Sequence, residues 1–263
     1  MNIETVLKTR GNVALLDREI LIAALLHKDR TWVLAHPETV FAEGEWMQLQ
    51  TWLKRREKKE PIAYILGEKE FYGRMFVVNS HTLIPRPSTE GLTELALIFL
   101  ETGEEQIRPL DTGIVGYARR YDDLKGVATV ADVGTGSGCI AITLALEQPD
   151  IRILATDVDA LALETAKENA RHYGVDMRID FFSGNLLAPL ADLQEPFIVV
   201  SNPPYIPEGE KLMEDVEGYE PHGALFAGKD GTDVLKALVA QARAHQLCRG
   251  MVLECREEQV NKL

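Results

Sequence analysis

Two short motifs hold residues whose types and spacing could do chemistry. The first runs from Asp132 through three alternating glycines, Gly134, Gly136 and Gly138, and glycines let a backbone turn tightly and approach a ligand closely. An apolar run precedes it and a second one follows, which places it where open α/β sheets bind ligands, at the carboxyl end of a strand. Asp157 comes 19 residues after Gly138, where a carboxylate can accept both ribose hydroxyls. The motif therefore predicts a site for an adenosine-type cofactor.

The charges around these glycines favour a cationic cofactor. A pyrophosphate prefers a helix N-terminus with cations nearby, but no Lys or Arg lies between residues 126 and 151, and Asp132 precedes the glycines. S-adenosylmethionine carries a sulfonium, an ammonium group and a ribose, which suit an anionic lip. We therefore favour S-adenosylmethionine over a nicotinamide cofactor, which stays the alternative.

The second motif is Asn202-Pro203-Pro204-Tyr205, directly after the apolar run 197–200. Two prolines fix the backbone and remove two N–H donors. Asn202 Oδ1 and the Pro203 carbonyl could then each accept one hydrogen from a planar –NH2 group, and Tyr205 could pack on its flat face. A glutamine amide and an adenine amine both offer such a group, so the motif alone does not choose between them.

The elements around the two motifs alternate in type. Alternating strands and helices predict a parallel sheet covered on both faces. The predicted strands are 127–133, 151–156, 177–182, 197–201 and 251–255, and the predicted helices are 140–147, 160–173, with Gly174 after its end, and 233–245.

The first half of the chain has a different texture. In residues 1–66 apolar residues recur at helical spacing, which predicts helices. The basic run 54–60 suits either a solvated helix end or a docking patch for an acidic partner. A hairpin is predicted around Asn79-Ser80, and Ser88 could cap the helix that follows. Residues 101–126 are polar and glycine-rich, which predicts a long loop.

Composition excludes several classes of protein. The 263 residues carry a net charge of −13, which argues against a protein that grips nucleic acid by its phosphates. No apolar run reaches the roughly 18 residues of a membrane span, and residues 1–10 resemble no targeting segment. Cys139, Cys248 and Cys255 form no CxxC pair, so we expect no metal site and a cytoplasmic protein.

The glycine motif together with Asn-Pro-Pro-Tyr resembles the class I, amino-methylating methyltransferases. Further segments are similar to the HemK/PrmC family, which methylates the glutamine N5 of peptide chain release factors. The similar segments are 28–38, 60–67, 71–73, 83–90, Glu220-Pro221 and 228–231. The resemblance covers nearly the whole chain.

This resemblance implies an α/β fold: a Rossmann-like, mostly parallel methyltransferase sheet with a small N-terminal helical domain. It implies a helical substrate-recognition domain over 1–66, a β-hairpin linker over 67–85 and a methyltransferase domain over 86–263. The implied cofactor is S-adenosylmethionine and the implied partner is a release factor. We expect a monomer that binds neither nucleic acid nor membrane.

The resemblance also assigns roles to residues. Asn202, Pro203, Pro204 and Tyr205 would hold the substrate amide and form the catalytic wall. Asn185 and Leu186 would border the adenine, and Asp157 would take the ribose. The remaining cofactor-binding residues would be Gly134, Thr135, Gly136, Ser137, Gly138 and Asn202, and Arg86, Pro87, Thr89 and Glu90 would line the site from the hairpin side.

The chain departs from the family pattern in three places. Asn185 stands where the family often has Asp, and the loop 101–126 is longer than expected. The chain ends at Leu263, soon after the fifth predicted strand, whereas the family's sheet continues through a helix and a final hairpin. The sequence is therefore either a fragment, truncated at its C-terminal end, or one whose sheet is incomplete. The alternative functions are an N6-adenine DNA or RNA methyltransferase, a ribosomal-protein glutamine methyltransferase and a non-catalytic binding module.

Overall fold

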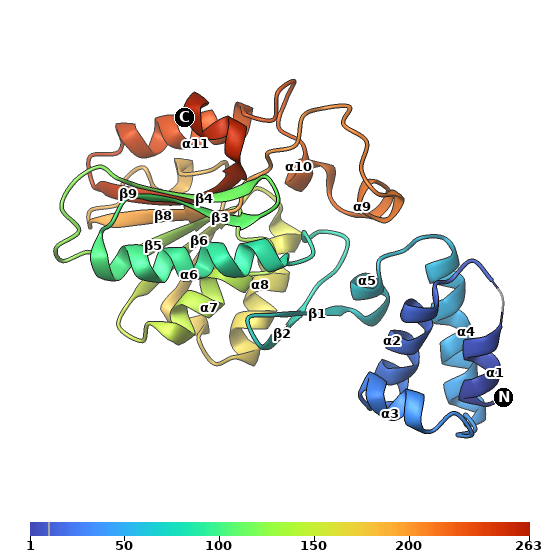
Figure 1. The fold of residues 1–263 in the computed structure, drawn as a ribbon. Coiled ribbons are helices and arrows are strands. Elements are labelled where there is room, and N and C mark those ends of the chain that lie inside the picture. The colour runs from blue at the N-terminus through green and yellow to red at the C-terminus, as the bar shows by residue number, and fades with distance from the viewer. Residues whose placement is uncertain (10) are drawn as a thin grey trace. The chain divides into compact units, whose positions relative to one another are not determined.

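The computed structural model describes residues 1–9 and 11–263. The chain forms two compact units (Figure 1). The helical unit consists of Met1–Glu68 together with Leu212–Tyr219, and the sheet unit consists of Lys69–Lys211 together with Glu220–Leu263. No helix of the described residues is long and apolar enough to cross a membrane.

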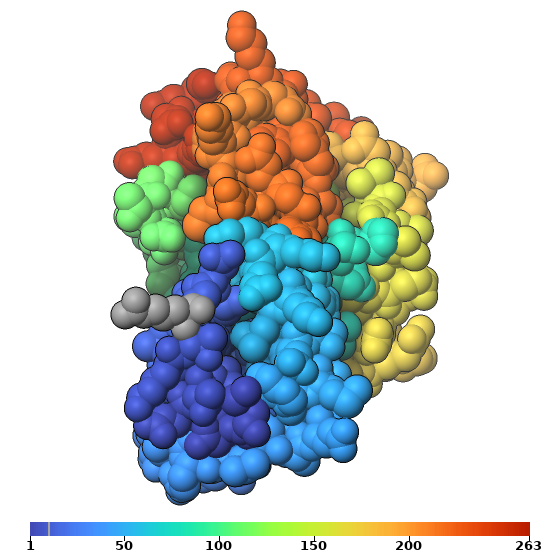
Figure 2. Space-filling view, turned by 90° about the vertical axis from the view of Figure 1, so that its right-hand side faces the viewer, coloured from blue at the N-terminus to red at the C-terminus, as the bar shows by residue number. Residues whose placement is uncertain are grey.

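The helical unit is built around one apolar cluster. Its members include Ile3, Leu21, Val33, Leu49 and Ile65, all at most 4% exposed. The blue-to-cyan surface of these helices is seen from outside in Figure 2. In its described part the unit contains α1 (Ile3–Lys8), α2 (Leu15–Leu26), α3 (Arg30–Ala35), α4 (Glu43–Glu57), α5 (Ile62–Leu66) and α9 (Glu214–Tyr219).

Two arginines of the basic run at the end of α4 form ion pairs within the helical unit. Arg55 Nη2 lies 2.5 Å from Glu60 Oε1. Arg56 reaches Asp17 Oδ2 at 2.7 Å and Asp215 Oδ2 at 3.5 Å. The sequence suggested a solvated helix end or a docking patch, but Arg56 instead holds α9 against α2 and α4.

The short hairpin lies earlier in the chain than the sequence predicted. Strands β1 (Glu68–Phe71) and β2 (Arg74–Val77) are joined by Tyr72 and Gly73, whose φ angles are 54° and 72°. Two consecutive positive φ angles are what a two-residue hairpin turn requires. The expected hairpin at Asn79-Ser80 is wrong: that segment is a tight turn closed by Thr82 N–H donating to Asn79 O at 3.0 Å, and it joins no strands.

The described part of the sheet unit forms a seven-stranded sheet with the order β3-β4-β9-β8-β5-β6-β7, where β3 is Gln106–Asp111 and β4 is Ile114–Arg120 (Figure 1). The five strands β5 to β9 are parallel, which confirms the predicted parallel sheet. Their bounds are β5 (Thr129–Val133), β6 (Arg152–Asp157), β7 (Ile179–Ser183), β8 (Phe197–Ser201) and β9 (Cys248–Arg256). Residues 177 and 178, predicted as the start of the strand 177–182, belong instead to a 3-10 turn, η1 (Asp176–Arg178).

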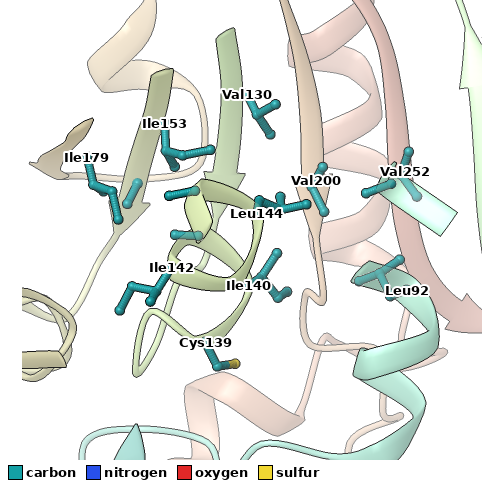
Figure 3. Packing of buried hydrophobic residues seen from close by; sticks show 14 of the residues in the cluster. Leu92, Val130, Cys139, Ile140, Ile142, Leu144, Ile153, Ile179, Val200 and Val252 are labelled. Carbon is teal, nitrogen blue, oxygen red and sulfur yellow. The ribbon is translucent and has the colours of Figure 1, made fainter. Parts of the chain in front are cut away.

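Helices cover both faces of the sheet. On one face α6 (Pro87–Thr102), α7 (Cys139–Glu147) and α8 (Ala160–His172) pack on alternate strand residues such as Val130 and Ile153 (Figure 3). On the other face α11 (Asp233–Ala244) packs on their neighbours, Ala131 and Leu154. The short elements η2 (Ala188–Leu190), α10 (His222–Leu225) and η3 (Glu257–Lys262) lie in connections and at the end of the chain.

The residues 101–126, expected to form a loop, contain two strands. Strand β3 (Gln106–Asp111) pairs antiparallel with β4 (Ile114–Arg120), and β4 pairs antiparallel with β9. This hairpin occupies the sheet edge beside β9, where an incomplete sheet would lack strands. Of the two alternatives, the incomplete sheet is therefore wrong, because strands from upstream of β5 fill that edge.

Two glycines let α6 lie close to this edge. A Cβ on Gly116 of β4 would lie 2.5 Å from Leu95 Cδ2, and one on Gly250 of β9 would lie 2.8 Å from Phe99 Cζ. Glycine within a strand commonly marks such a close approach. At its start, α6 has Arg86 as N-cap and Pro87 as first residue, so Ser88 is not the cap that the sequence suggested.

Candidate active site

One pocket of about 410 Å³ opens at the carboxyl ends of β5, β6 and β8, and all of its lining residues belong to the sheet unit. Most of the residues singled out from the sequence line it. These are Arg86, Thr89, Gly134, Thr135, Gly136, Ser137, Asp157, Asn185, Leu186, Asn202 and Pro204. Gly138, Pro203, Tyr205, Pro87 and Glu90 are not among the lining residues.

The glycine loop connects β5 to α7 and is tied to the neighbouring strand. The N–H groups of Gly134 and Thr135 donate to Thr156 O at 2.8 and 3.0 Å. Gly134 and Gly136 have φ angles of 73° and 56°, and a Cβ on either would meet no atom within 4 Å. These two glycines therefore present open space to the pocket. At Gly138 a Cβ would lie 3.1 Å from Ala166 Cβ, so that glycine serves the packing of α7 on α8.

Asp132 lies beneath the loop and not at a lip of the pocket, which corrects the sequence interpretation. The residue is fully buried. Its Oδ2 accepts hydrogen bonds from Thr135 Oγ1 at 2.6 Å and from Ala141 N at 3.1 Å, while its buried Oδ1 has no hydrogen-bond partner among the described residues. Burial raises the pKa of Asp132 to about 7. The side chain thus braces the loop and the start of α7.

The pKa of Asp132 predicts a pH-dependent stability. In the unfolded chain an aspartate titrates near 4, so between about pH 4 and 7 the folded protein holds a proton that the unfolded chain has released. The stability that this extra proton gives the folded protein is complete below pH 4. It is lost as the pH rises to 7, by at most ~1.4 kcal/mol per pH unit.

The variant Asp132→Asn mimics the protonated acid and isolates this contribution. Urea unfolding of both proteins without cofactor, from pH 4.5 to 8, should give free energies of unfolding that diverge as pH rises, with the variant becoming the more stable. Parallel curves over that range would contradict the raised pKa.

Asp157 ends β6 and faces the pocket. Its Oδ2 accepts from Gly136 N at 2.9 Å and its Oδ1 accepts from Asp159 N at 2.9 Å. Burial raises the pKa of Asp157. Further along the wall, Leu186 adopts a φ of 54°, and Thr156 Oγ1 donates to its carbonyl at 3.0 Å. A non-glycine residue held in the left-handed region is strained, and such strain clusters at ligand sites.

Asn202 begins the turn after β8. Next to it, Ser201 Oγ donates to Val133 O at 2.6 Å and ties the end of β8 to the end of β5. Asn202 Nδ2 donates to Thr89 Oγ1 at 2.9 Å. The glycine loop and Asn202 therefore reach one pocket from two adjacent parallel strands.

The tyrosine of the motif turns away from the pocket lining. Tyr205 OH donates to Glu254 Oε1 at 3.1 Å, and the Tyr205 carbonyl accepts from Gln259 Nε2 at 2.9 Å. Gly231 passes so close that a Cβ there would lie 2.3 Å from Tyr205 O. The end of the chain and the 228–231 segment thus clamp the turn.

Sequence reasoning overlooked the buried Glu254. It lies in β9, where Ser88 Oγ, Thr89 Oγ1 and Tyr205 OH all donate to it. Burial raises the pKa of Glu254, although these three hydrogen bonds oppose the shift. One charged residue inside the apolar run 251–255 was the available signal, since a buried carboxylate needs partners.

Two other glutamates hold the hairpin side of the pocket and its neighbours by hydrogen bonds. Glu90, expected at the site, instead accepts from Tyr72 N at 2.9 Å on the hairpin side. Glu220, buried before α10, accepts from Ile84 N at 3.0 Å and from Arg86 Nη2 at 2.5 Å. Arg86 therefore lines the pocket with its charge already paired. No group of His, Cys, Asp and Glu side chains in the described chain could hold a metal ion.

Two family models match parts of this chain, and curated relatives match most of it. Residues 3–67 match the PrmC N-terminal domain and residues 121–217 match the methyltransferase small domain. A release factor glutamine methyltransferase of Nitratidesulfovibrio vulgaris is 38% identical over 86% of this chain and 70% of its own length. One from Coxiella burnetii is 34% identical over 100% of this chain and 86% of its own length.

The N-terminal domain of human METTL16, in complex with SAH, is 15% identical, and the match covers 84% of this chain and 71% of that one with a TM-score of 0.46.

Proposed function

Because this chain belongs to the family of release factor glutamine methyltransferases, we propose that its pocket transfers a methyl group to a release-factor glutamine, with the residue roles given below. The chain is an S-adenosylmethionine-dependent protein-glutamine N5-methyltransferase. One observation supports these residue roles. The glycine loop and Asn202 line one pocket, at the ends of the paired strands β5 and β8.

The residues of the pocket fit the cofactor. Gly134 and Gly136 leave space that any side chain would fill, Asp157 offers a carboxylate for ribose hydroxyls, and the volume of about 410 Å³ lies in the range of small-molecule sites. When bound, S-adenosylmethionine supplies an electrophilic methyl group. Asn185 and Leu186 would border its adenine.

The protein's own contribution to catalysis is orientation and charge. A glutamine amide nitrogen is a poor nucleophile, because its lone pair is delocalised into the carbonyl. Asn202 Oδ1 and the Pro203 carbonyl accept its two hydrogens and hold the nitrogen in line for attack, an effect that can supply about 7–11 kcal/mol. Both acceptors also oppose the positive charge that grows on nitrogen, so they stabilise the transition state more than the bound substrate.

The test of this function is an assay with methyl-labelled cofactor and four candidate substrates. We expect label on a whole release factor, none on the same factor with its target glutamine replaced by alanine, and none on DNA or RNA. Mass spectrometry should find a single methyl group on the glutamine side chain. Label on adenine with the protein substrates untouched would reverse the assignment.

Asp157→Ala should weaken the binding of S-adenosylmethionine by about 1.5–3 kcal/mol, the range for losing hydrogen bonds to a charged group. Calorimetry measures the change. A control is Asp180→Ala, which removes an exposed strand-end carboxylate paired with Arg152 outside the pocket, and its affinity should match that of the wild type. Equal affinity of Asp157→Ala and wild type would remove Asp157 from the site.

The helical unit is proposed to recognise the release factor. All residues that line the pocket lie outside it, so it is free for another role. A chain shortened to begin at Gly67 should bind cofactor and methylate a short glutamine peptide, yet lose most kcat/KM on a whole release factor. Full activity on the whole factor would contradict this role.

The charge and the substrate class of the enzyme also bear on its location and on its binding of nucleic acid. The net charge of −13 supports an enzyme that does not grip nucleic acid, and its substrate class supports a cytoplasmic location. We propose that it acts as a monomer, which light scattering at assay concentration would test.

A further inference from the structure

Behind Asn202 lies a chain of hydrogen bonds that ends on a buried carboxylate. Asn202 Nδ2 lies 2.9 Å from Thr89 Oγ1, and Thr89 Oγ1 lies 2.9 Å from Glu254 Oε2. Glu254 is fully buried in β9, and Thr89, only 3% exposed, lies in the first turn of α6. Three elements far apart in sequence thus meet at this point: the start of α6, the turn after β8, and β9.

The ionised form of Glu254 is supported from several sides, against the burial that raises its pKa. Ser88 Oγ and Tyr205 OH reach its Oε1 at 3.0 and 3.1 Å, so three hydroxyl groups donate to one carboxylate. Ser88 and Thr89 belong to the first turn of α6, where the helix dipole favours an anion. An ionised carboxylate can only accept hydrogen bonds.

Counting hydrogens decides how the Asn202 amide is turned. Thr89 has one hydroxyl hydrogen, and Glu254 takes it because a carboxylate has none to give. Thr89 Oγ1 can then only accept from Asn202, so the NH2 of Asn202 must face Thr89. In the reverse orientation Asn202 Oδ1 would face an oxygen with no hydrogen to offer, and two acceptors would oppose each other.

We propose that Glu254 is a positioning residue that sets the orientation of the Asn202 side-chain amide through Thr89. The orientation matters because only Oδ1 can accept a hydrogen from the substrate amide; a flipped Asn202 would present N–H groups to the N–H groups of glutamine. The proposal rests on the proposed role of Asn202 and deepens it: Glu254 acts on the reaction without touching the substrate.

A double-mutant cycle on the full chain tests the connection. Thr89→Val keeps the shape of the side chain but can neither accept from Asn202 nor donate to Glu254, and we expect kcat to fall at least 10-fold. Glu254→Leu leaves the hydrogen of Thr89 free to face Asn202, and we expect a similar fall. Both changes break the same series of hydrogen bonds. The double variant should therefore have a kcat no lower than that of Thr89→Val alone.

Two further variants separate positioning from support of the fold. Thr89→Ser restores the hydroxyl and should recover kcat to within about threefold of the wild type. Ser88→Ala removes one of the three donors to the same carboxylate but has no contact with Asn202. Because Thr89 and Tyr205 still donate to Glu254, kcat should again stay within about threefold. In all folded variants KM for the cofactor should change less than threefold. These comparisons also carry the test should Glu254→Leu fail to fold.

Four results would contradict a positioning role for Glu254. Multiplicative losses in the cycle, wild-type kcat in Thr89→Val, no recovery in Thr89→Ser, or a loss in Ser88→Ala equal to that in Thr89→Val would each overturn the role of Glu254. These results require a wild-type enzyme that methylates the release-factor glutamine. Failure of the wild type itself would overturn the proposed function instead.

Discussion

Replacing Gly136 by valine should abolish measurable binding of S-adenosylmethionine. Gly136 has a φ of 56°, and a Cβ built on it would meet no protein atom within 4 Å. The methyl groups of valine would therefore extend into the pocket space that the cofactor needs. We expect calorimetry to find at least a 100-fold loss of affinity, and kcat/KM to fall with it.

Backbone strain in Gly136→Val would also destabilise the folded protein, because β-branched residues are disfavoured at positive φ. Gly113 in the turn between β3 and β4 separates the two effects. It has a φ of 71°, open space around its Cβ position and no place in the pocket lining. Gly113→Val should therefore carry similar strain and bind cofactor like the wild type. Equal losses of affinity in both variants would show that strain, and not occlusion, removes binding.

The sequence was sufficient to find the walls of this pocket. Gly136, Asp157 and Asn202 each follow a strongly apolar segment, and the carboxyl ends of neighbouring parallel strands must meet at one sheet edge. Their convergence is therefore a consequence of the βα pattern. Glu254 could not be reached in this way, because its partners Ser88 and Tyr205 come from segments whose approach depends on the tertiary fold.

The hairpin β3–β4 was missed for a physical reason. An edge strand faces solvent over much of its surface, and the burial of β3 alternates between half-buried and exposed residues. A charged side chain such as Arg108 is favoured at such an edge, since it discourages pairing with other chains. Such charges, together with Gly113 and Gly116, made the segment resemble a polar loop.

The hairpin at Tyr72-Gly73 was misplaced by a similar ambiguity. Asn79-Ser80 is a typical turn sequence and does form a turn, but no strand follows it. Tyr72 gave no turn signal, because a bulky residue at positive φ is uncommon. Its conformation is explained by the neighbouring glycine and by Glu90, which accepts from the Tyr72 N–H at 2.9 Å.

Replacing Asn202 by alanine should lower kcat on the order of 100-fold, as when one preorganised partner of the transition state is removed. The lost acceptor interacts more strongly as the nitrogen becomes positive, so the change belongs to the transition state and not to uniform binding. The affinity for cofactor should stay within a few-fold of the wild-type value by calorimetry. Asn79→Ala is the matched control, because Asn79 Nδ2 also donates to a threonine, Thr165, at 2.9 Å but lies outside the pocket lining.

Asn202→Asp is the sharper probe of the same site. Aspartate keeps an acceptor for the substrate, yet its second oxygen would face Thr89 Oγ1, whose one hydrogen already goes to Glu254. The new carboxylate would also attract a sulfonium away from the line of attack. We therefore expect cofactor affinity at least equal to that of the wild type together with a reduced kcat. A variant that keeps wild-type kcat would mean that neither the amide of Asn202 nor its orientation contributes to methyl transfer.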